Sequence, residues 1–208
     1  MARTLGAVCK RCRREGVKLF LKGARCDTAL CAFQRRPSAP GMHGFKRGKM
    51  TDYGMHLREK QKVKTYYGVL EKQFRKYYQM AERAKGNTGK VLMTLLEKRL
   101  DNIVYRLGFA SSRAQARQII AHGHILVNGV KVDIASFLVR AGDVISVKNR
   151  KNSIEFVKSA LSSMNRERPE FLVNNETEIP SGVMLRDPVA DDVSIAVEPQ
   201  LIVELCSK

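Results

Sequence analysis

The sequence lacks any long hydrophobic run. Its longest apolar segments fall far short of the ~20 residues that a membrane-spanning helix needs. It also does not open with the charged and then apolar segments that mark a secretory signal peptide. We therefore expect the protein to stay in the cytoplasm, whose reducing environment argues against a disulfide framework among its five cysteines.

The motifs of common enzymes are missing as well. The chain has no glycine-rich nucleotide-binding fingerprint and no nucleophile elbow. Its four histidines have no evident carboxylate or cysteine partner arranged for catalysis. A length of 208 residues allows one or two domains with a real core, but leaves little room for a separate catalytic domain. We predict that the protein is not an enzyme.

Acidic residues are few compared with basic ones. Lysine and arginine total 38 against 20 acidic residues, which gives a net charge of +18. Residues 1–50 hold thirteen basic and two acidic side chains, whereas residues 165–208 hold four basic and nine acidic ones. Because such a positive charge opposes compaction, it indicates a polyanionic partner. We expect the basic half to lie on phosphate and the acidic segment to face away or meet a basic neighbouring protein.

Four of the cysteines cluster near the N-terminus. Cys9, Cys12, Cys26 and Cys31 are separated by two, thirteen and four residues, close to the paired pattern of a structural zinc site. Four thiolates complete a tetrahedron, so one Zn²⁺ here would stabilise the fold and leave no position open for a reacting water. Four cysteine ligands also hold iron–sulfur clusters, and spacing alone does not separate the two. We favour zinc.

Periodicity predicts a mostly helical first half. Residues 1–50 show no helical or strand period, so we expect them to be extended and to be disordered without RNA. Apolar residues at three- or four-residue steps predict a basic helical region over 53–80, broken near Gly68. A helix over 92–107 should stop at Gly108. The next helix should begin with a capping box of Ser112 and Gln115, and the two helices form a helix-turn-helix.

The period then drops to two residues. Asn128-Gly129, between 125–127 and 130–134, is typical of a type I′ hairpin, and strands near 137–139 and 144–147 should complete a small antiparallel sheet. We expect a short helix over 154–164 and strands in "EFLVN", "SGVML" and "QLIVEL". The predicted fold class is α+β. Its predicted domains are a zinc-binding basic extension (1–50), a basic helical domain (51–96), an RNA-binding module (97–160) and an acidic segment whose short strands pack back on the preceding domains (161–208).

The predicted RNA-binding side chains come from three parts of the chain. Arg113 and Arg117 share a helical face, and the positive end of their helix can also meet phosphate. Beside them, a polar rim favours recognition of RNA shape and backbone over a read sequence. The remaining predicted contacts are Gln115, Gln118, His122, His124, Asn128 and Lys131 in the module, Arg11, Arg13, Arg14, Arg35, Arg36, Lys46 and Arg47 in the extension, and Lys60, Lys62 and Lys64 in the helical domain.

Two segments resemble a known family. "LEKRLDNIVYRLGFASSRAQARQIIAHGHILVNGVKVDI" closely resembles the S4 RNA-binding module, and "YGMHLREKQKVKTYYGVLEKQFRKYY" resembles the upstream helices of the bacterial ribosomal protein S4 family, uS4. The upstream segment is the specific part, because the module also occurs in other RNA-binding proteins and enzymes. The four-cysteine start resembles the zinc-binding branch of the family. Family members often carry an aromatic residue where Cys206 stands.

The resemblance implies a structural constituent of the small ribosomal subunit. Such a protein binds the 5′ domain of 16S rRNA at a multi-helix junction as a primary binding protein, nucleates assembly of the subunit body and contributes to translational accuracy. The resemblance also implies contacts with protein uS5 and with the region where mRNA enters the ribosome. Two other classes stay open: an RNA-modifying or tRNA enzyme carrying the same module, and a sequence-specific DNA regulator. The basic extension and the hairpin favour folded RNA.

Overall fold

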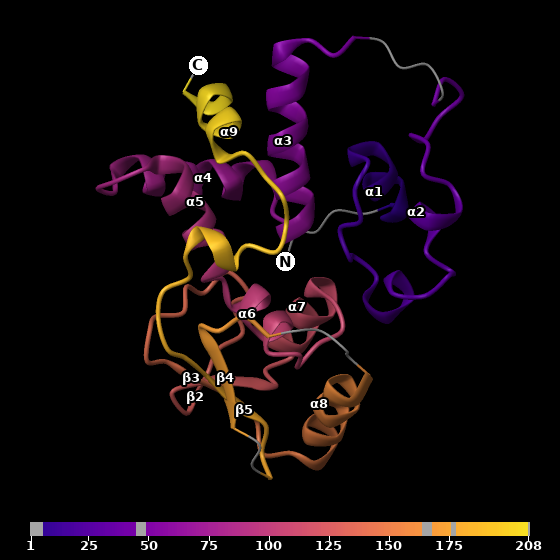
Figure 1. Cartoon of the computed structure of the whole chain (residues 1–208). Coiled ribbons are helices and arrows are strands. Elements are labelled where there is room, and N and C mark those ends of the chain that lie inside the picture. The colour runs from indigo at the N-terminus through magenta and orange to yellow at the C-terminus, as the bar shows by residue number, and fades with distance from the viewer. Residues whose placement is uncertain (1–5, 45–48, 164–167, 176–177, 208) are drawn as a thin grey trace. The chain divides into compact units, whose positions relative to one another are not determined.

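The computed structural model describes residues 6–44, 49–163, 168–175 and 178–207 (Figure 1). Its contacts divide the chain into two compact units, residues 1–93 together with 195–208, and residues 94–194. The first unit is helical and the second places helices on an antiparallel sheet, so the predicted α+β class is confirmed. No helix in the described parts of the chain is long and apolar enough to cross a membrane.

The first unit starts with three short helices: α1 (Cys9–Glu15), the 3-10 helix η1 (Gly23–Cys26) and α2 (Ala32–Arg35). Gly16 ends α1 in the left-handed conformation, with φ 67°, and its N–H donates to the Cys12 carbonyl. The expectation that residues 1–50 are extended is wrong for these segments. Leu19 is fully buried beside buried cysteines, and together they form a small local core that supports these helices. The helices are too short for a repeat of apolar residues in the sequence to reveal them.

Longer helices complete the first unit: α3 (Asp52–Tyr67), α4 (Glu71–Arg83) and α9 (Pro199–Cys206), with α5 (Thr88–Glu97) leading into the second unit. Thr51 caps α3, since its hydroxyl accepts from the Gly54 N–H at 3.2 Å. The predicted break at Gly68 is confirmed, because this residue closes α3 with φ 62°. The core of the unit is largely aromatic and contains Val63, Tyr66, Tyr67, Phe74, Tyr77 and Tyr78.

Helix α9 occupies the segment "QLIVEL", for which a strand was the wrong prediction. A short apolar run satisfies the helical and the strand period equally well, so the sequence does not decide between them. In the structure Pro199 stands in the first turn, Ile202 is fully buried, and the helix packs against α3 (Figure 1). This packing, which joins residues far apart in the sequence, selects the helix.

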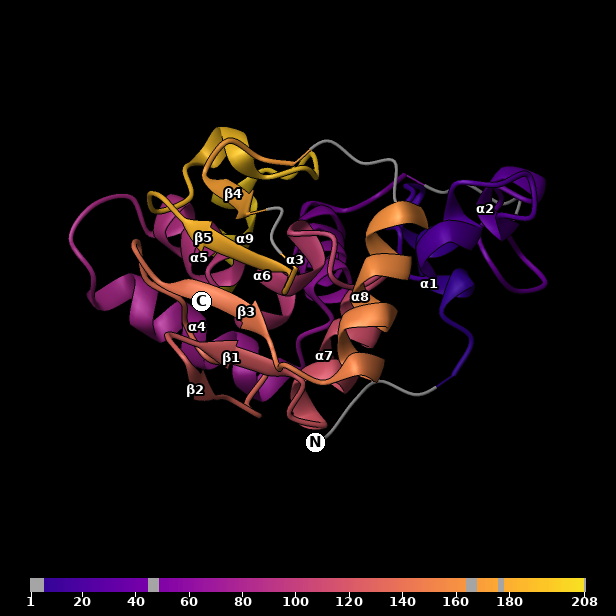
Figure 2. The ribbon, with the colours of Figure 1, turned by 90° about the horizontal axis from the view of Figure 1, so that it is seen from below.

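The second unit contains α6 (Leu100–Arg106), α7 (Arg113–Ala121), α8 (Lys151–Ser163) and a 3-10 helix, η2 (Ala190–Asp192). Its strands are β1 (Ile125–Val127), β2 (Val130–Lys131), β3 (Val144–Val147), β4 (Leu172–Asn175) and β5 (Ser181–Met184). They form one antiparallel sheet in the order β2-β1-β3-β5-β4 (Figure 2). Leu100, Ile103, Ile120, Ile145 and Phe171 are fully buried in the core between helices and sheet.

The predicted hairpin between β1 and β2 is confirmed. Asn128 and Gly129 have φ values of 50° and 79°, as a type I′ turn requires at both central positions. The Asn128 amide donates to Asp143 at 2.8 Å, and its oxygen accepts from the Val144 N–H at 2.9 Å. Asn128 therefore ties the turn to the start of β3.

Two predicted elements near the start of the module are wrong. The helix over 92–107 is interrupted at Lys98 and Arg99, where Arg99 is extended with φ −66° and ψ 135°. Residues 137–139 form no strand and contribute only an isolated bridge between Leu138 and Arg99. The Leu100 N–H donates to the Phe137 carbonyl at 2.8 Å, so this long-range pairing breaks the helix at a point where the apolar period continues.

Candidate nucleic-acid interface

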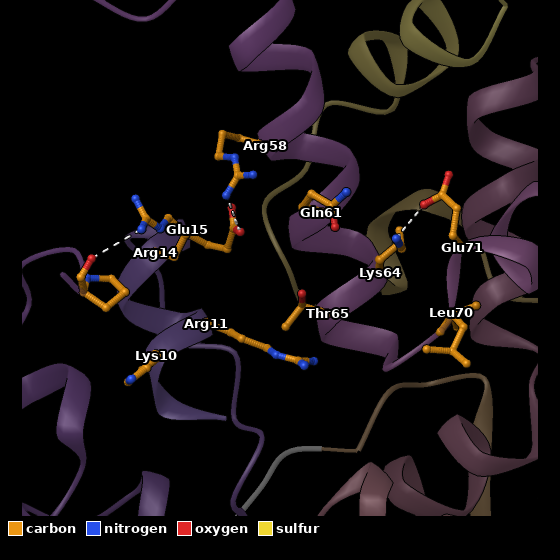
Figure 3. A pocket seen from close by; sticks show the side chains of 12 residues that line it. Lys10, Arg11, Arg14, Glu15, Arg58, Gln61, Lys64, Thr65, Leu70 and Glu71 are labelled. Carbon is orange, nitrogen blue, oxygen red and sulfur yellow. Dashed lines mark hydrogen bonds and ion pairs between the residues drawn. The ribbon is translucent and has the colours of Figure 1, made fainter. Parts of the chain in front are cut away.

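A basic pocket of about 400 Å³ lies in the first unit between α1, α3 and the start of α4 (Figure 3). Five basic side chains line it against two carboxylates: Lys10, Arg11, Arg14, Arg58 and Lys64 against Glu15 and Glu71. The predicted contacts Arg11, Arg14 and Lys64 are thus brought together from segments 50 residues apart. The surplus of positive charge suits an anion such as a phosphate.

Each carboxylate of this pocket is held by a basic side chain. Arg58 donates to Glu15 at 3.2 Å, and Lys64 donates to Glu71 at 2.5 Å (Figure 3). Burial raises the pKa of Glu15, although Arg58 and Lys62 offset part of that rise. Burial also raises the pKa of Glu71, but hydrogen bonds from Lys60 and Lys64 outweigh it and lower the pKa from 4.5 to about 2. Glu71 is therefore ionised at neutral pH and anchors two lysines.

The other predicted RNA-binding side chains of the first unit differ in how far they are exposed or already engaged by other residues. Arg35 and Arg36 are exposed at the end of α2. Arg13 donates to the Ser38 carbonyl at 2.9 Å, and Lys62 is half-buried and paired with Glu59. Lys60 is 9% exposed and donates to Glu71 at 2.6 Å, which indicates a structural role. Lys46 and Arg47 lie outside the described residues.

In the second unit, Arg113 and Arg117 do not present one exposed face. Arg113 is only 6% exposed, donates to the Asn102 amide oxygen at 2.9 Å and stacks over Tyr105 at 4.4 Å from the ring centre. Arg117 is half-buried and donates to the buried Asp101 at 2.6 Å. The placement of Arg113 contradicts the expectation that it meets phosphate at the surface. Through these contacts the guanidinium groups of Arg113 and Arg117 join a buried polar network that holds α6 against α7.

Four other predicted contacts gather around one pocket between α7 and α8, of about 310 Å³. They are Gln115, Gln118, His122 and His124. The Gln115 N–H donates to Ser112 at 3.3 Å, as predicted for the cap, but its side-chain oxygen accepts from Ser111 at 2.7 Å, so the capping box is only half formed. Asn128 and Lys131 are exposed at the hairpin, away from this pocket's lining.

Sequence reasoning missed several residues that line these pockets. Lys10, Arg58 and Gln61 complete the basic pocket, and Asn152 and Phe156 complete the one between α7 and α8. A signal was present in both places. Arg58, Gln61 and Lys64 recur at three-residue steps on one helical face, and Asn152 and Phe156 are four residues apart.

The four N-terminal cysteines line one small cavity of about 10 Å³. Cys9 and Cys12 come from α1, Cys26 ends η1 and Cys31 precedes α2. Burial raises the pKa of Cys12, a backbone hydrogen bond from Leu19 lowers it, and the other three thiols raise it further. Within the described residues no three His, Cys, Asp or Glu side chains already have metal-ligand geometry. The thiols thus converge on a common void without standing at ligand distance from one point.

The comparisons with known proteins cover the whole chain. A family model described as "Ribosomal protein S4/S9 N-terminal domain" matches residues 3–97, and an "S4 domain" model matches residues 98–145. Proteins named small ribosomal subunit protein uS4 are 53% identical in Thermoanaerobacter sp. (strain X514) and 52% identical in Desulfitobacterium hafniense (strain Y51). The uS4A protein of Clostridium novyi (strain NT) is 54% identical. Each match covers 100% of both chains. Because these relatives match the chain over its whole length, and therefore over both units, the chain belongs to the uS4 family of small ribosomal subunit proteins.

Proposed function

We propose that the protein is a structural, RNA-binding constituent of the small ribosomal subunit in the cytoplasm, and not an enzyme. The observation that carries this function is the match along the full chain to proteins named for that subunit, at 52 to 54% identity. The S4 domain over residues 98–145 supplies an RNA-binding module. The basic pocket of the first unit supplies charge for the phosphate backbone.

We further propose that the bound RNA is the 5′ domain of 16S rRNA, that binding is primary, and that it nucleates assembly of the subunit body and contributes to translational accuracy. Two features support an RNA backbone partner. The basic side chains are concentrated in residues 1–100, and exposed arginines such as Arg35 and Arg36 remain outside the internal ion pairs that the described residues make. Phosphate contacts of this kind position a protein on folded RNA without reading its sequence.

Co-sedimentation and direct binding together test the proposal. The protein made in its own cells should sediment with small subunits, and the purified chain should bind a 5′-domain transcript alone, before other ribosomal proteins are added. A large-subunit rRNA fragment of equal length, at the same salt concentration, is the matched control because it offers the same phosphates. Equal affinity for the two transcripts would leave only non-specific binding and reject the primary role.

We also propose protein uS5 and the region where mRNA enters the ribosome as neighbours. The acidic C-terminal segment supports a basic protein partner, because Asp187 and Asp191 are exposed there. Crosslinking from a cysteine introduced at Asp191 within assembled subunits tests the first contact. Crosslinks to other proteins but none to uS5 would reject it.

We propose that Cys9, Cys12, Cys26 and Cys31 hold one structural Zn²⁺. Support comes from the shared cavity of about 10 Å³ that all four cysteines line. The Lys22 N–H donates to the Cys26 sulfur at 3.3 Å, a contact that also stabilises a thiolate. Bound there, zinc would link α1 to the end of η1 and to the start of α2, and would supply no catalysis.

Metal analysis of the purified protein decides this assignment. One equivalent of zinc is expected. Iron accompanied by visible absorption would support the alternative iron–sulfur cluster, and the absence of both metals from protein prepared without chelators would reject the site.

A further inference from the structure

The pocket between α7 and α8 has features that phosphate contacts alone leave unexplained. Its lining consists of Gln115, Gln118, Ile119, His122, His124, Asn152, Ser153 and Phe156. Both helices belong to the second unit, and Figures 1 and 2 show them as neighbours. The volume of about 310 Å³ lies at the lower end of the ~300–1,000 Å³ typical of small-ligand pockets. It suits one flat ring system with its sugar and is too small for a helix.

One side of the pocket is formed by Phe156, an aromatic residue that lies outside the hydrophobic core. Phe156 is 43% exposed, whereas α8 packs on its unit through Ser153, Val157 and Ala160. His122 and His124 add two more rings, with centroids 6.1 Å apart. Unstacked RNA bases are bound by stacking on the side chains of phenylalanine, tyrosine, tryptophan and histidine.

Polar groups surround these rings. The Gln115 oxygen is engaged by Ser111, which turns the remaining hydrogen-bonding capacity of that side chain to its amide nitrogen. Gln118 and Asn152 are exposed and each carry a donor and an acceptor, the combination that hydrogen-bonds base edges. The buried Ser153 hydroxyl fixes the His124 ring through a 2.9 Å contact with Nδ1.

Basic side chains neighbour the residues that line the pocket, and the imidazole of His124 within that lining is neutral. Burial lowers the pKa of His124, and His122, Arg150 and Lys148 lower it further, so this ring is uncharged at neutral pH. Arg150 and Lys151 are exposed where α8 begins. A neutral ring in the cavity lining, with Arg150 and Lys148 near it, matches a nucleotide, which has an apolar, hydrogen-bonding base and a charged phosphate.

We propose that this pocket binds one unstacked nucleotide of the RNA, with the base stacked on Phe156 and its edge met by the amides of Gln118 and Asn152. The proposal rests on the RNA-binding function above and deepens it. Backbone contacts of the first unit then supply most of the affinity, while this pocket selects RNA that offers an unpaired base at the right place.

The test compares Phe156→Leu and Phe156→Tyr in the full chain, binding a 5′-domain rRNA transcript over a salt series. Leucine keeps apolar bulk but removes the ring, so affinity should fall roughly 5- to 100-fold. The slope of log affinity against log salt should stay unchanged, because a phenyl ring neutralises no phosphate. Tyrosine retains a stacking face and should restore affinity. Phe137→Leu is the matched control, since Phe137 is 37% exposed in the same unit but outside the pocket.

Chemical probing of the bound transcript gives a second readout that a merely structural role for Phe156 would not produce. The parent should protect one unpaired base at its Watson–Crick edge, and Phe156→Leu should lose that protection while backbone protections persist. Parental affinity in a folded Phe156→Leu variant overturns the pocket assignment, as does an equal loss in Phe137→Leu. Failure of the parent itself to bind the transcript rejects the proposed function instead, so the two failures are distinguishable.

Discussion

Asp101 joins two arginines in the interior of the second unit. Its carboxylate, 1% exposed, accepts from Arg99 at 2.8 Å and from Arg117 at 2.6 Å. Asp101→Asn would keep the shape of the side chain but remove the carboxylate charge that pairs with the Arg99 guanidinium, which is only 2% exposed. We expect the free energy of unfolding to fall by about 3 to 5 kcal/mol.

Chemical denaturation of the purified chain measures this loss. Asp133→Asn, which removes an exposed carboxylate from the same module, is the control and should change stability by less than about 0.5 kcal/mol. If both variants unfold at the same denaturant concentration, the buried ion pairs contribute little and the unit is stabilised by its apolar core alone.

Glu71 makes the stability of the first unit dependent on pH. Because its pKa is lowered from 4.5 to about 2 by Lys60 and Lys64 against the opposing effect of burial, its contribution is complete above pH 4.5 and disappears as the pH falls toward 2. Glu71→Gln should therefore be less stable than the parent at about pH 6, with the difference shrinking by about pH 3. Urea titrations at several pH values measure it. A difference that does not vary with pH would mean that the carboxylate charge is not what holds the two lysines.

At the scale of an element, the β1–β2 hairpin depends on the backbone conformation of its turn. Gly129 has φ 79°, and a Cβ built there meets no atom within 4 Å, so substitution is opposed by backbone strain and not by a clash. Gly129→Val should cost about 1 to 3 kcal/mol, whereas Gly129→Asn should cost much less because asparagine tolerates positive φ. Thermal unfolding of the two variants checks this order. Equal melting temperatures would contradict it.

The three short N-terminal helices are the part of the chain that the proposed Zn²⁺ would hold together. Cys9→Ser with Cys12→Ser removes two proposed zinc ligands, and with them much of the ~10 kcal/mol or more of binding energy that comparable sites contribute. We expect amide exchange to rise throughout residues 6–44 while α3, α4 and the second unit stay protected. Cys206→Ser, a half-buried thiol outside the cluster, is the control. Unchanged protection in the double variant would show that Leu19 and its neighbours fold this segment without metal.

Local chemistry explains which elements the sequence predicts. Gly68, Ser112 and the Asn128-Gly129 pair act on their own backbone, and each ends, starts or turns an element where expected. Long-range contacts explain the failures. The break at Arg99 is set by pairing with Leu138, and α9 is set by packing on α3, both of which join residues distant in sequence.

The candidate site follows the same division. The four cysteines line one cavity and the α7 side chains line one pocket. Their spacing indicates both groupings, because the members of each group lie largely close together in the sequence. Arg113 could not be placed this way. An arginine four residues from another shares its helical face, but only the partners across the unit, Asn102 and Tyr105, show that its side chain is directed inward.

At the scale of the whole molecule, the basic residues serve two roles: some are exposed and can bind RNA, and others stabilise the interior. The basic half carries exposed cations, whereas the arginines in the interior of the module bind Asp101, Asn102 and Glu97. Arg113→Gln should thus reduce stability and leave the salt dependence of RNA binding unchanged. The cations that set this dependence must be sought where side chains are exposed, and Arg35 and Arg36 at the end of α2 meet that condition.

Replacing Arg35 and Arg36 with glutamine tests whether phosphate attraction by the basic half supplies most of the binding energy. Each lost phosphate contact should reduce the slope of log affinity against log salt by roughly 0.7 to 0.9, so the double variant should flatten it by about 1.5. Asp191→Asn with Glu198→Gln removes two exposed charges from the acidic segment and should leave the slope nearly unchanged. Filter binding of each folded variant to a 5′-domain transcript across a salt series separates the two. A parental slope in the arginine variant would place the end of α2 away from the RNA, and the phosphate contacts would then have to come from the basic pocket around Arg11 and Arg58.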